Sequence, residues 1–567
     1  MQAVGLKFNQ IQLPATFTQF LYIQLNHYFK KHRRDFSRWS VSVLVITFLI
    51  GIPAIFIFAK LFDGPGESWK HIARYLLAKY VQNSLYLAFS CAVFTMFFGI
   101  VSAWFSVRYE FPGRKMLEWL LILPLAVPSY ITAYAYAGIF DYGGSLNLLL
   151  SQFSLHIGRI DLMNIYGLSL VLSISLYPYV YVACRAFFLH HSQSLIEASQ
   201  MLGKREVQHF FKLIFPMARP AVVGGVILVL MEVLNDYGAA KYYGVNTFTT
   251  GIFKSWFGYK EPDTAIYLSA LLLIIIFSLI IIEQKQRKKR QFAIDSANDR
   301  KLERLHSSKV RRFLISFIVA LPVILGFVIP VAQLTYWAAI TYSGINWSEL
   351  LRVVLQSLGI ATFAAISCVL VSVALLVVKD WNRLSWVNHL SKIGILGYAI
   401  PGAVIAVGVY IPGLYLDKWL IRFVQQTFSI KISLLLTGTV IALIYAYVVR
   451  FLAVAFNPIA AGKEKIQPGL IEASQSLGKG ALYTFSKIEL PLLRPALLGA
   501  FILVFIDVMK ELPLTLILKP YYVQTLAIEA YQYASDERIM EAAMPSLIII
   551  ATGVFPVIFL NRLIEKR

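Results

Sequence analysis

Long apolar runs constrain the fold of this chain more than any other feature of its sequence. A helix needs about 20 mostly apolar residues to cross the hydrocarbon core of a bilayer. Hydrophobic residues make up 58% of the chain and charged residues only 14%, against about a quarter charged in soluble domains. The sequence therefore predicts an all-α polytopic membrane protein with about twelve transmembrane helices, at residues 39–60, 80–105, 117–139, 164–187, 219–243, 264–284, 313–340, 351–378, 388–412, 433–456, 494–518 and 544–562.

The basic residues indicate how these spans are oriented. The net charge is +22, and lysine and arginine gather in alternate loops, which is the positive-inside pattern of membrane proteins. The richest loop, residues 285–312, is therefore expected in the cytoplasm, together with both termini. The loops at 141–163, 246–263, 413–432 and 519–543 then face outward. The lipid bilayer accounts for the charge pattern, and nucleic-acid binding is not expected, because no basic module interleaved with aromatic residues appears.

The N-terminal arm, residues 1–38, carries no cleavable signal pattern. Residues 14–28 within it form either an interfacial helix or a disordered segment. Neither the cysteines nor the histidines have the spacing of a disulfide framework or a metal site, so none is predicted. These residues are Cys91, Cys184, Cys368, His190, His191 and His209.

An internal repeat organises the chain. Residues 196–204 read IEASQMLGK and residues 471–479 read IEASQSLGK, and the match continues at an offset of 275 residues through Arg219-Pro220 and Arg494-Pro495. Upstream, Ala126-Val127-Pro128 matches Ala399-Ile400-Pro401 at an offset of 273. The chain is therefore expected to hold two modules of six helices, 39–284 and 313–567, joined by the basic linker 285–312. Because six spans return the chain to its starting side, the modules should be related by a pseudo-two-fold axis along the membrane normal.

The repeated motif lies in a cytoplasmic loop between the fourth and fifth spans of each module. In each copy it is predicted to form a helix, a glycine turn and a second, amphipathic helix, which Pro216 ends in the first copy. A compact two-helix element in such a loop indicates a docking surface. The motif residues are Glu197, Ala198, Gly203, Leu213, Phe215 and Pro216 in the first copy, and Glu472, Ala473, Gly478, Ile488, Leu490 and Pro491 in the second.

This pattern resembles the signature loop of permease subunits in binding-protein-dependent ABC importers. Both copies have serine, Ser199 and Ser474, at the family's third alanine position, and the first copy replaces isoleucine and leucine by Leu213 and Phe215. The resemblance implies that each loop inserts a coupling helix into an ABC ATPase subunit. It implies two such subunits and a periplasmic substrate-binding protein as partners.

The fused layout, the segment Leu123–Tyr130 and the segment Asn235–Ala239 are most similar to ferric-iron permeases. Thiamine and phosphonate permeases share this layout, so those solutes, or another small one, stay open as alternatives. A secondary transporter driven by an ion gradient is a further alternative, which the duplicated coupling loop disfavours. The sequence contains no G-x-x-x-x-G-K-[ST] motif, so ATP and its magnesium are expected on the partner, with no cofactor and no catalytic residue in this chain.

Four carboxylates interrupt the fifth spans of the two modules. Glu232 and Asp236 lie four residues apart, and their repeat equivalents are Asp507 and Glu511. Because residues four apart share one helical face, each pair is expected to face the same way. Carboxylates inside a membrane usually face a watery cavity or pair with each other or with a cation. They are therefore candidates for lining the translocation path of a cationic solute, with a structural pair, neutralised in part by Lys510, as the alternative.

Overall fold

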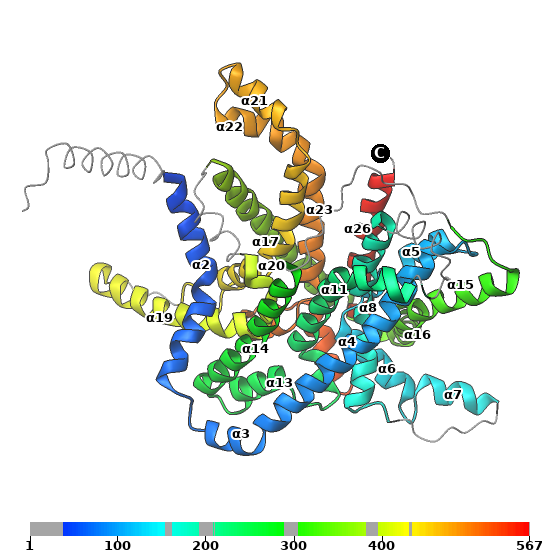
Figure 1. Cartoon of the computed structure of the whole chain (residues 1–567). Helices are drawn as coiled ribbons and strands as arrows, with labels where there is room; N and C mark the ends of the chain where they lie inside the picture. The colour runs from blue at the N-terminus through cyan, green and yellow to red at the C-terminus, as the bar shows by residue number, and fades with distance from the viewer. Residues whose placement is uncertain are drawn as a thin grey trace, which may run out of the picture.

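The computed structural model describes residues 38–153, 161–191, 208, 210–288, 304–381, 395–429 and 434–565. The expectations for the N-terminal arm, for Glu197, Ala198 and Gly203, and for His209 fall outside these residues. Within them the chain is helical apart from loops and one isolated β-bridge, so the predicted all-α class is confirmed. Figure 1 shows the helices packed into one bundle.

The first half of the chain runs from α2 to α14. Two of its helices are preceded or followed by π-helical turns, η3 (Phe210–Ile214) and η4 (Lys254–Gly258), and a 3-10 turn, η2 (Leu123–Ala126), precedes α6. The helices are α2 (Arg38–Lys60), α3 (Trp69–Tyr75), α4 (Leu77–Arg108), α5 (Arg114–Leu120), α6 (Ser129–Phe140), α7 (Ser145–Gln152), α8 (Ile165–His191), α11 (Phe215–Asn235), α12 (Gly238–Tyr242), α13 (Phe248–Phe253) and α14 (Pro262–Lys288).

The second half runs from α15 to α26 and repeats the order of the long helices of the first. Its irregular turns are η6 (Ile324–Val328) and η9 (Phe485–Glu489), both π-helical, and the 3-10 turns η7 (Tyr342–Gly344) and η8 (Ile395–Ala399). The helices are α15 (Lys309–Val323), α16 (Ile329–Thr341), α17 (Trp347–Trp381), α19 (Gly402–Phe428), α20 (Val440–Glu464), α21 (Pro468–Ser476), α22 (Ala481–Thr484), α23 (Leu490–Met509), α24 (Pro513–Leu518), α25 (Leu526–Ser535) and α26 (Ala543–Glu565).

The number of spans differs slightly from the prediction. Ten helices of the described part are long and apolar enough to cross a membrane, and a pair of segments bent by 94° between η2 and α6 is an eleventh if it counts as one broken span. The predicted span at 544–562 is α26, whose apolar part within Ala543–Pro556 is shorter than the rest. The predicted outward loop at 413–432 is also partly helical, because α19 continues to Phe428.

Proline breaks one predicted span in each half at equivalent positions. Pro128 and Pro401 have φ of −55° and ψ of 139° and 142°, so both leave the helical region just before α6 and α19 begin. The preceding residues match as well, since Val127 N donates to Pro124 O and Ile400 N donates to Gly397 O, each at 3.1 Å. The residue before proline is disfavoured in helical conformation, which explains why a continuous helix does not form there. The spans predicted as continuous at 117–139 and 388–412 are thus wrong in this respect.

The first long helix of each half packs against the other half. Helix α2 contacts α17 and α19 as well as α14, and α15 and α16 contact α4, α5 and α6. In Figure 1 α2 lies beside α19 at the left, whereas α15 and α16 lie at the right. Between these outer helices α4, α8 and α11 pack together, as do α17, α20 and α23. The hairpin α21–α22 projects from the end of the bundle where the chain ends, opposite α3 and α13.

Candidate functional site

The breaks in the two halves of the chain enclose a central cavity of about 80 Å³, which has room for several water molecules. Its walls come from residues within 125–130, 175–179 and 232–238 of the first half and from residues 398, 450–451 and 507–513 of the second. All four predicted carboxylates, Glu232, Asp236, Asp507 and Glu511, line it. The structure therefore brings together, across the contact of the two halves, residues that lie up to 279 positions apart in the sequence.

Asp236 is buried on the first-half side, where neutral groups hold its carboxylate. Ser129 Oγ donates to its Oδ2 at 2.7 Å, and the Ala240 backbone N–H donates to its Oδ1 at 3.0 Å. Its own carbonyl accepts from Thr249 Oγ1 at 2.6 Å. Among the described residues no lysine or arginine forms an ion pair with Asp236, so its charge is balanced only by hydrogen-bond donors.

Glu511, its repeat equivalent, is also buried, but it forms an ion pair with an arginine side chain. Arg450 Nε lies 3.3 Å from Glu511 Oε2, and the Leu514 backbone N–H donates to Oε1 at 3.1 Å. Where the first half has Ser129, the second has Gly402, and a Cβ there would lie 2.5 Å from Glu511 Oε1 and 2.8 Å from Arg450 Nη1. Glycine at this position therefore provides the space that the longer carboxylate and its arginine occupy.

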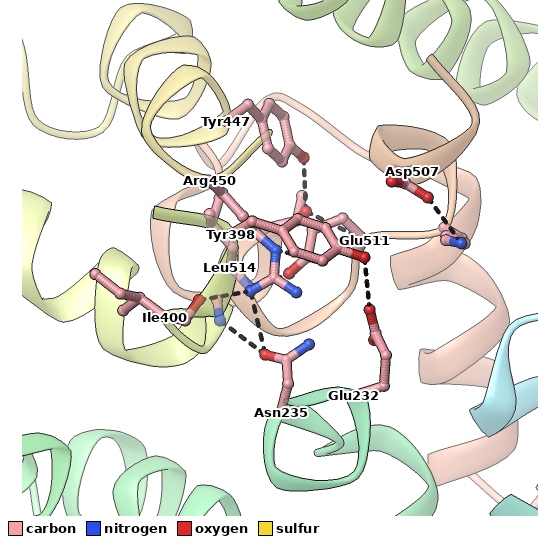
Figure 2. Close-up of polar contacts among 12 residues, drawn as sticks. Glu232, Asn235, Tyr398, Ile400, Tyr447, Arg450, Asp507, Glu511 and Leu514 are labelled. Carbon is pink, nitrogen blue, oxygen red and sulfur yellow. Dashed lines mark hydrogen bonds and ion pairs between the residues drawn. The ribbon is translucent and has the colours of Figure 1, made fainter. Parts of the chain in front are cut away.

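Arg450 also reaches across to the first half (Figure 2). Its Nη1 donates to Asn235 Oδ1 at 3.2 Å and to the Ile400 carbonyl at 3.3 Å. The same Asn235 oxygen accepts from the Gly402 backbone N–H at 2.7 Å. Asn235 thus connects the end of α11 to the start of α19, and it is one of the contacts that hold the two sides of the cavity together.

The other two carboxylates repeat the same contrast. Glu232 Oε1 accepts hydrogen bonds from Tyr398 Oη at 3.1 Å and, more weakly, from Tyr179 Oη at 3.5 Å. Its equivalent Asp507 pairs with Lys510 Nζ at 2.8 Å, as the structural alternative anticipated. The lysine stands at the repeat position of Asn235, so the first half has a neutral amide where the second half has a cation.

One part of the sequence prediction is wrong. Asp236 does not share a helical face with Glu232, because α11 ends at Asn235 and Asp236 has ψ of 125°. Glu511 likewise follows the end of α23, and the residues from Lys510 to Leu512 separate that helix from α24. The equivalent bonds Asp236 N to Val233 O, 3.3 Å, and Glu511 N to Val508 O, 3.1 Å, close both helix ends in the same way.

Sequence reasoning missed Arg450, Asn235 and the two tyrosines. Arg450 carried a usable signal, because a charged residue inside a span marks a buried partner or a cavity, and residues 433–456 were predicted to span. Asn235 stood out only as part of the segment Asn235–Ala239, with nothing to show its partner, and Tyr398 did not stand out, because single polar residues near helix ends are common.

The second copy of the repeated loop has the predicted helix, turn and helix. Glu472 and Ala473 lie in α21, Gly478 has φ of +75°, and α22 follows. The turn is closed by hydrogen bonds from Gly478 N to Gln475 O, 2.9 Å, and from Lys479 N to Ser474 O, 3.2 Å. A side-chain bond between Ser474 Oγ and Thr484 Oγ1, 2.8 Å, joins the two helices. The hairpin is therefore a compact element that leaves Leu470, Leu477, Leu482 and Tyr483 exposed.

The proline of the motif does not end the second helix. In the second copy α22 continues through the π-helical turn η9 into α23, and Ile488, Leu490 and Pro491 lie along this path. In the first copy Leu213 lies in η3, and Phe215 and Pro216 begin α11. A π-helical turn stands directly before the helix that contains each proline, and such local adjustments accommodate the missing backbone donor of a proline inside a helical path. The prediction that Pro216 terminates the helix is wrong.

The chain matches the family of binding-protein-dependent transport system inner membrane components twice, over residues 95–287 and 373–567. It belongs to this family. It is 25% identical, over 92% of its length and 97% of the relative's, to the Fe(3+)-transport system permease protein FbpB 2 of Haemophilus influenzae. It is 22% identical to the ferric transport system permease protein FbpB of Actinobacillus pleuropneumoniae, over 82% of this chain and 69% of that one. The sulfate transport system permease protein CysT of Escherichia coli is 27% identical over 32% of this chain and 64% of its own length.

Membership of this family identifies the chain as the multi-pass inner-membrane permease of an ABC importer that works with a substrate-binding protein. It also agrees with the internal repeat, because the family occurs once in each half. The alternative of an ion-driven secondary transporter is thereby set aside. The module boundaries and the direction of the pseudo-two-fold axis stay predictions.

Proposed function

We propose that this permease carries a cation, ferric iron, through the central cavity. The observation on which this proposal depends is that four carboxylates at equivalent positions of two repeated modules line one cavity between them. Two of them, Asp507 and Glu511, have a cation of their own, whereas Glu232 and Asp236 have only neutral donors among the described residues. The cavity therefore keeps an excess of negative charge, which lowers the energy of a cation inside it.

Iron as the substrate is supported by the relatives. Two relatives that match most of this chain are named as Fe(3+) or ferric transport permeases. A binding protein would deliver the ion to the side of the bundle that bears α3 and α13. With both termini in the cytoplasm, α21–α22 would project on the opposite, cytoplasmic side.

Energy would come from two ATPase subunits, one on each repeated loop. The exposed apolar residues of α21–α22 support this. Four exposed apolar side chains on one short hairpin are typical of a surface that binds another protein. Binding of ATP between the two subunits would bring the loops together and open the cavity outward. Hydrolysis would reverse this change, so that the ion leaves toward the cytoplasm. ATP and magnesium would bind only to those subunits.

Reconstitution tests the substrate directly. The permease with its co-purifying ATPase is placed in liposomes, with the binding protein and radioactive ferric iron on one side. We expect ATP-dependent iron uptake that requires the binding protein. Uptake of thiamine or phosphonate in place of iron would overturn the iron assignment and favour the other fused permeases.

An oxyanion such as sulfate is the second candidate, because sulfate permeases match part of the chain and because Arg450 and Lys510 line the cavity. Both cations are already paired with carboxylates, which disfavours an anion there. Sulfate uptake in the same liposomes, without iron uptake, would establish this candidate instead.

The docking role of the hairpin has its own test. Gly478 has open space around its Cα, so Gly478→Val strains the backbone at φ of +75° without a clash. We expect the complex to assemble but iron uptake per ATP hydrolysed to fall severalfold. Gly480→Val, at a glycine with φ of −71° and equally open surroundings, is the matched control. Normal coupling in Gly478→Val would contradict the docking role.

A further inference from the structure

The oxygens around Glu232 are arranged unlike those of the other carboxylates in the cavity. Tyr398 Oη from the second half and Tyr179 Oη from α8 of the first both approach the same atom, Glu232 Oε1, at 3.1 and 3.5 Å. In Figure 2 Tyr398 and Glu232 point toward each other from opposite sides of the cavity. Within the described residues no group of three or more His, Cys, Asp or Glu side chains is placed to hold a metal. The donor oxygens nearest to Glu232 are therefore phenolic oxygens of tyrosine.

The spacing of these oxygens suits a small, hard cation. Around an ion with metal–oxygen bonds of about 2.0–2.1 Å in octahedral geometry, neighbouring oxygens lie about 2.9 Å apart. The separations of the two phenolic oxygens from Glu232 Oε1, 3.1 and 3.5 Å, exceed this value by less than one ångström, so each phenol needs only a small inward movement to share an ion with the carboxylate. Tyrosine and carboxylate oxygens are hard donors, and tyrosine is an established ligand of iron in proteins.

A further hydroxyl in the same cavity has no partner. Tyr130 is 5% exposed, it lines the cavity, and its Oη makes no hydrogen bond to any described residue. A buried hydroxyl without a partner is costly, and water or a passing ligand is the usual explanation. The cavity thus contains the Tyr130 hydroxyl, which has no hydrogen-bond partner among the described residues.

We infer that Tyr179, Tyr398 and Glu232 form a transient site for a trivalent metal ion during transport. This inference rests on the proposed function and names the groups that contact the substrate. When the ion binds, it forms one bond to each phenolic oxygen and one to the carboxylate, and the two phenolic protons leave to water in the cavity. Two phenolates and one carboxylate then carry three negative charges, which balance the ion without any change in its oxidation state. A divalent ion would match this set less well.

The division of the ligands between the two halves explains how the ion is released. Tyr398 precedes α19 in the second half, whereas Tyr179 and Glu232 belong to the first. Any movement that separates the halves removes one of the three ligands. A site that transports an ion must bind it weakly enough to let it go, and a ligand set that comes apart with the opening of the path meets this need.

The test uses the full permease with its ATPase in detergent and in liposomes. Ferric iron bound to phenolate gives a visible charge-transfer absorption, so ferric citrate added to the wild-type complex should produce this band. Gallium(III), which has the same charge and no such band, should compete and bleach it. The band should disappear in Tyr179→Phe with Tyr398→Phe, and iron uptake should fall at least tenfold while binding-protein-stimulated ATPase activity stays within about twofold.

Tyr134→Phe is the matched control, because Tyr134 is buried, has no partner for its hydroxyl among the described residues and does not line the cavity. It should keep both the band and the uptake. The single variant Tyr398→Phe, which removes one ligand and leaves the fold less disturbed, should weaken the band and slow uptake. Iron uptake without any band in the wild type, or a band and uptake unchanged in the double variant, would overturn this site while leaving iron transport standing. A wild type that transports another solute and no iron would overturn both proposals.

Discussion

The two halves of this permease present the same acidic positions to the central cavity but balance them differently. In the first half, Asp236 and Glu232 accept hydrogen bonds only from neutral groups within the described part of the chain, namely Ser129, Ala240 and Tyr179 of the same half and Tyr398 of the second. On the second-half side Arg450 and Lys510 form ion pairs with Glu511 and Asp507. Duplication therefore preserved where the carboxylates stand, whereas their partners diverged. The difference implies that the first half supplies the negative charge that a cation meets, and that the second half supplies contacts that hold the cavity together.

Removing the two unpaired carboxylates should have the largest effect. Glu232→Gln with Asp236→Asn keeps the size of both side chains and deletes the excess charge. At an effective dielectric constant of 20, one charge acts on another 4 Å away with about 4 kcal/mol, so we expect cation uptake to fall more than a hundredfold. ATPase stimulation should change far less, because the coupling loops are untouched. Radioactive uptake and phosphate release in the same liposomes provide the two measurements.

The paired control is Asp507→Asn with Lys510→Met, which deletes one negative and one positive charge together. Uptake should stay within about threefold of the wild type, since the net charge of the cavity is the same. An equal loss of uptake in the two double variants would break the distinction between the halves.

Breaking the ion pair of the second half should affect stability more than charge selection. Glu511→Gln leaves Arg450 buried without its counter-charge, and the loss of one partner of a buried pair costs about 3–5 kcal/mol. We expect a clearly lower thermal unfolding temperature in detergent. Arg450→Met combined with Glu511→Gln should restore much of this loss. A Glu511→Gln variant as stable as the wild type would show that the pair is not structural.

The smallest effect should come from substitutions at two equivalent positions, Ser129 beside Asp236 and Gly402 beside Glu511. Ser129→Gly removes one hydrogen bond to a charged group, worth about 1.5–3 kcal/mol before water replaces it, and the cavity can supply that water. Gly402→Ser instead forces an atom to within 2.5 Å of Glu511 Oε1, and overpacking costs about 1–3 kcal/mol. Unfolding temperatures should therefore fall slightly in Ser129→Gly and further in Gly402→Ser. A larger fall in Ser129→Gly than in Gly402→Ser would mean that the two positions are not each fitted to the carboxylate beside them.

How far the sequence predicts this molecule depends on the kind of residue. Apolar runs and the repeat predict the helices, their order and the twofold occurrence of the family, because hydropathy and self-similarity are properties of long segments. The four carboxylates were found because a charge inside an apolar run is conspicuous. The helix breaks at Asp236 and Glu511 were missed. Gly238 lies two residues after Asp236 and Pro513 two residues after Glu511, and a glycine or a proline can equally stand inside a kinked span.

The cross-half contacts were beyond prediction for another reason. Asn235 and Gly402 lie 167 positions apart, and their hydrogen bond depends on how two modules dock, which no local pattern records. The same holds for Tyr398 and Glu232, 166 positions apart. The pair of Asp507 and Lys510, by contrast, is local, and the sequence suggested it as an alternative because the two residues lie close together in the chain.

Solvent access at position 236 tests the central claim most directly, namely that the unpaired carboxylates line the path of the solute. The native cysteines Cys91, Cys184 and Cys368 are buried and are first replaced by alanine or serine. Asp236→Cys is then treated with a small, water-soluble thiol reagent in the nucleotide-free complex and in the complex trapped with ATP, with Val229→Cys, at a buried position of α11 outside the cavity, as the control. The account predicts that the cysteine at 236 reacts, with a rate that differs at least tenfold between the two states, while the control stays inert. A cysteine at 236 that remains unreactive in both states would contradict the account and make these carboxylates buried structural groups.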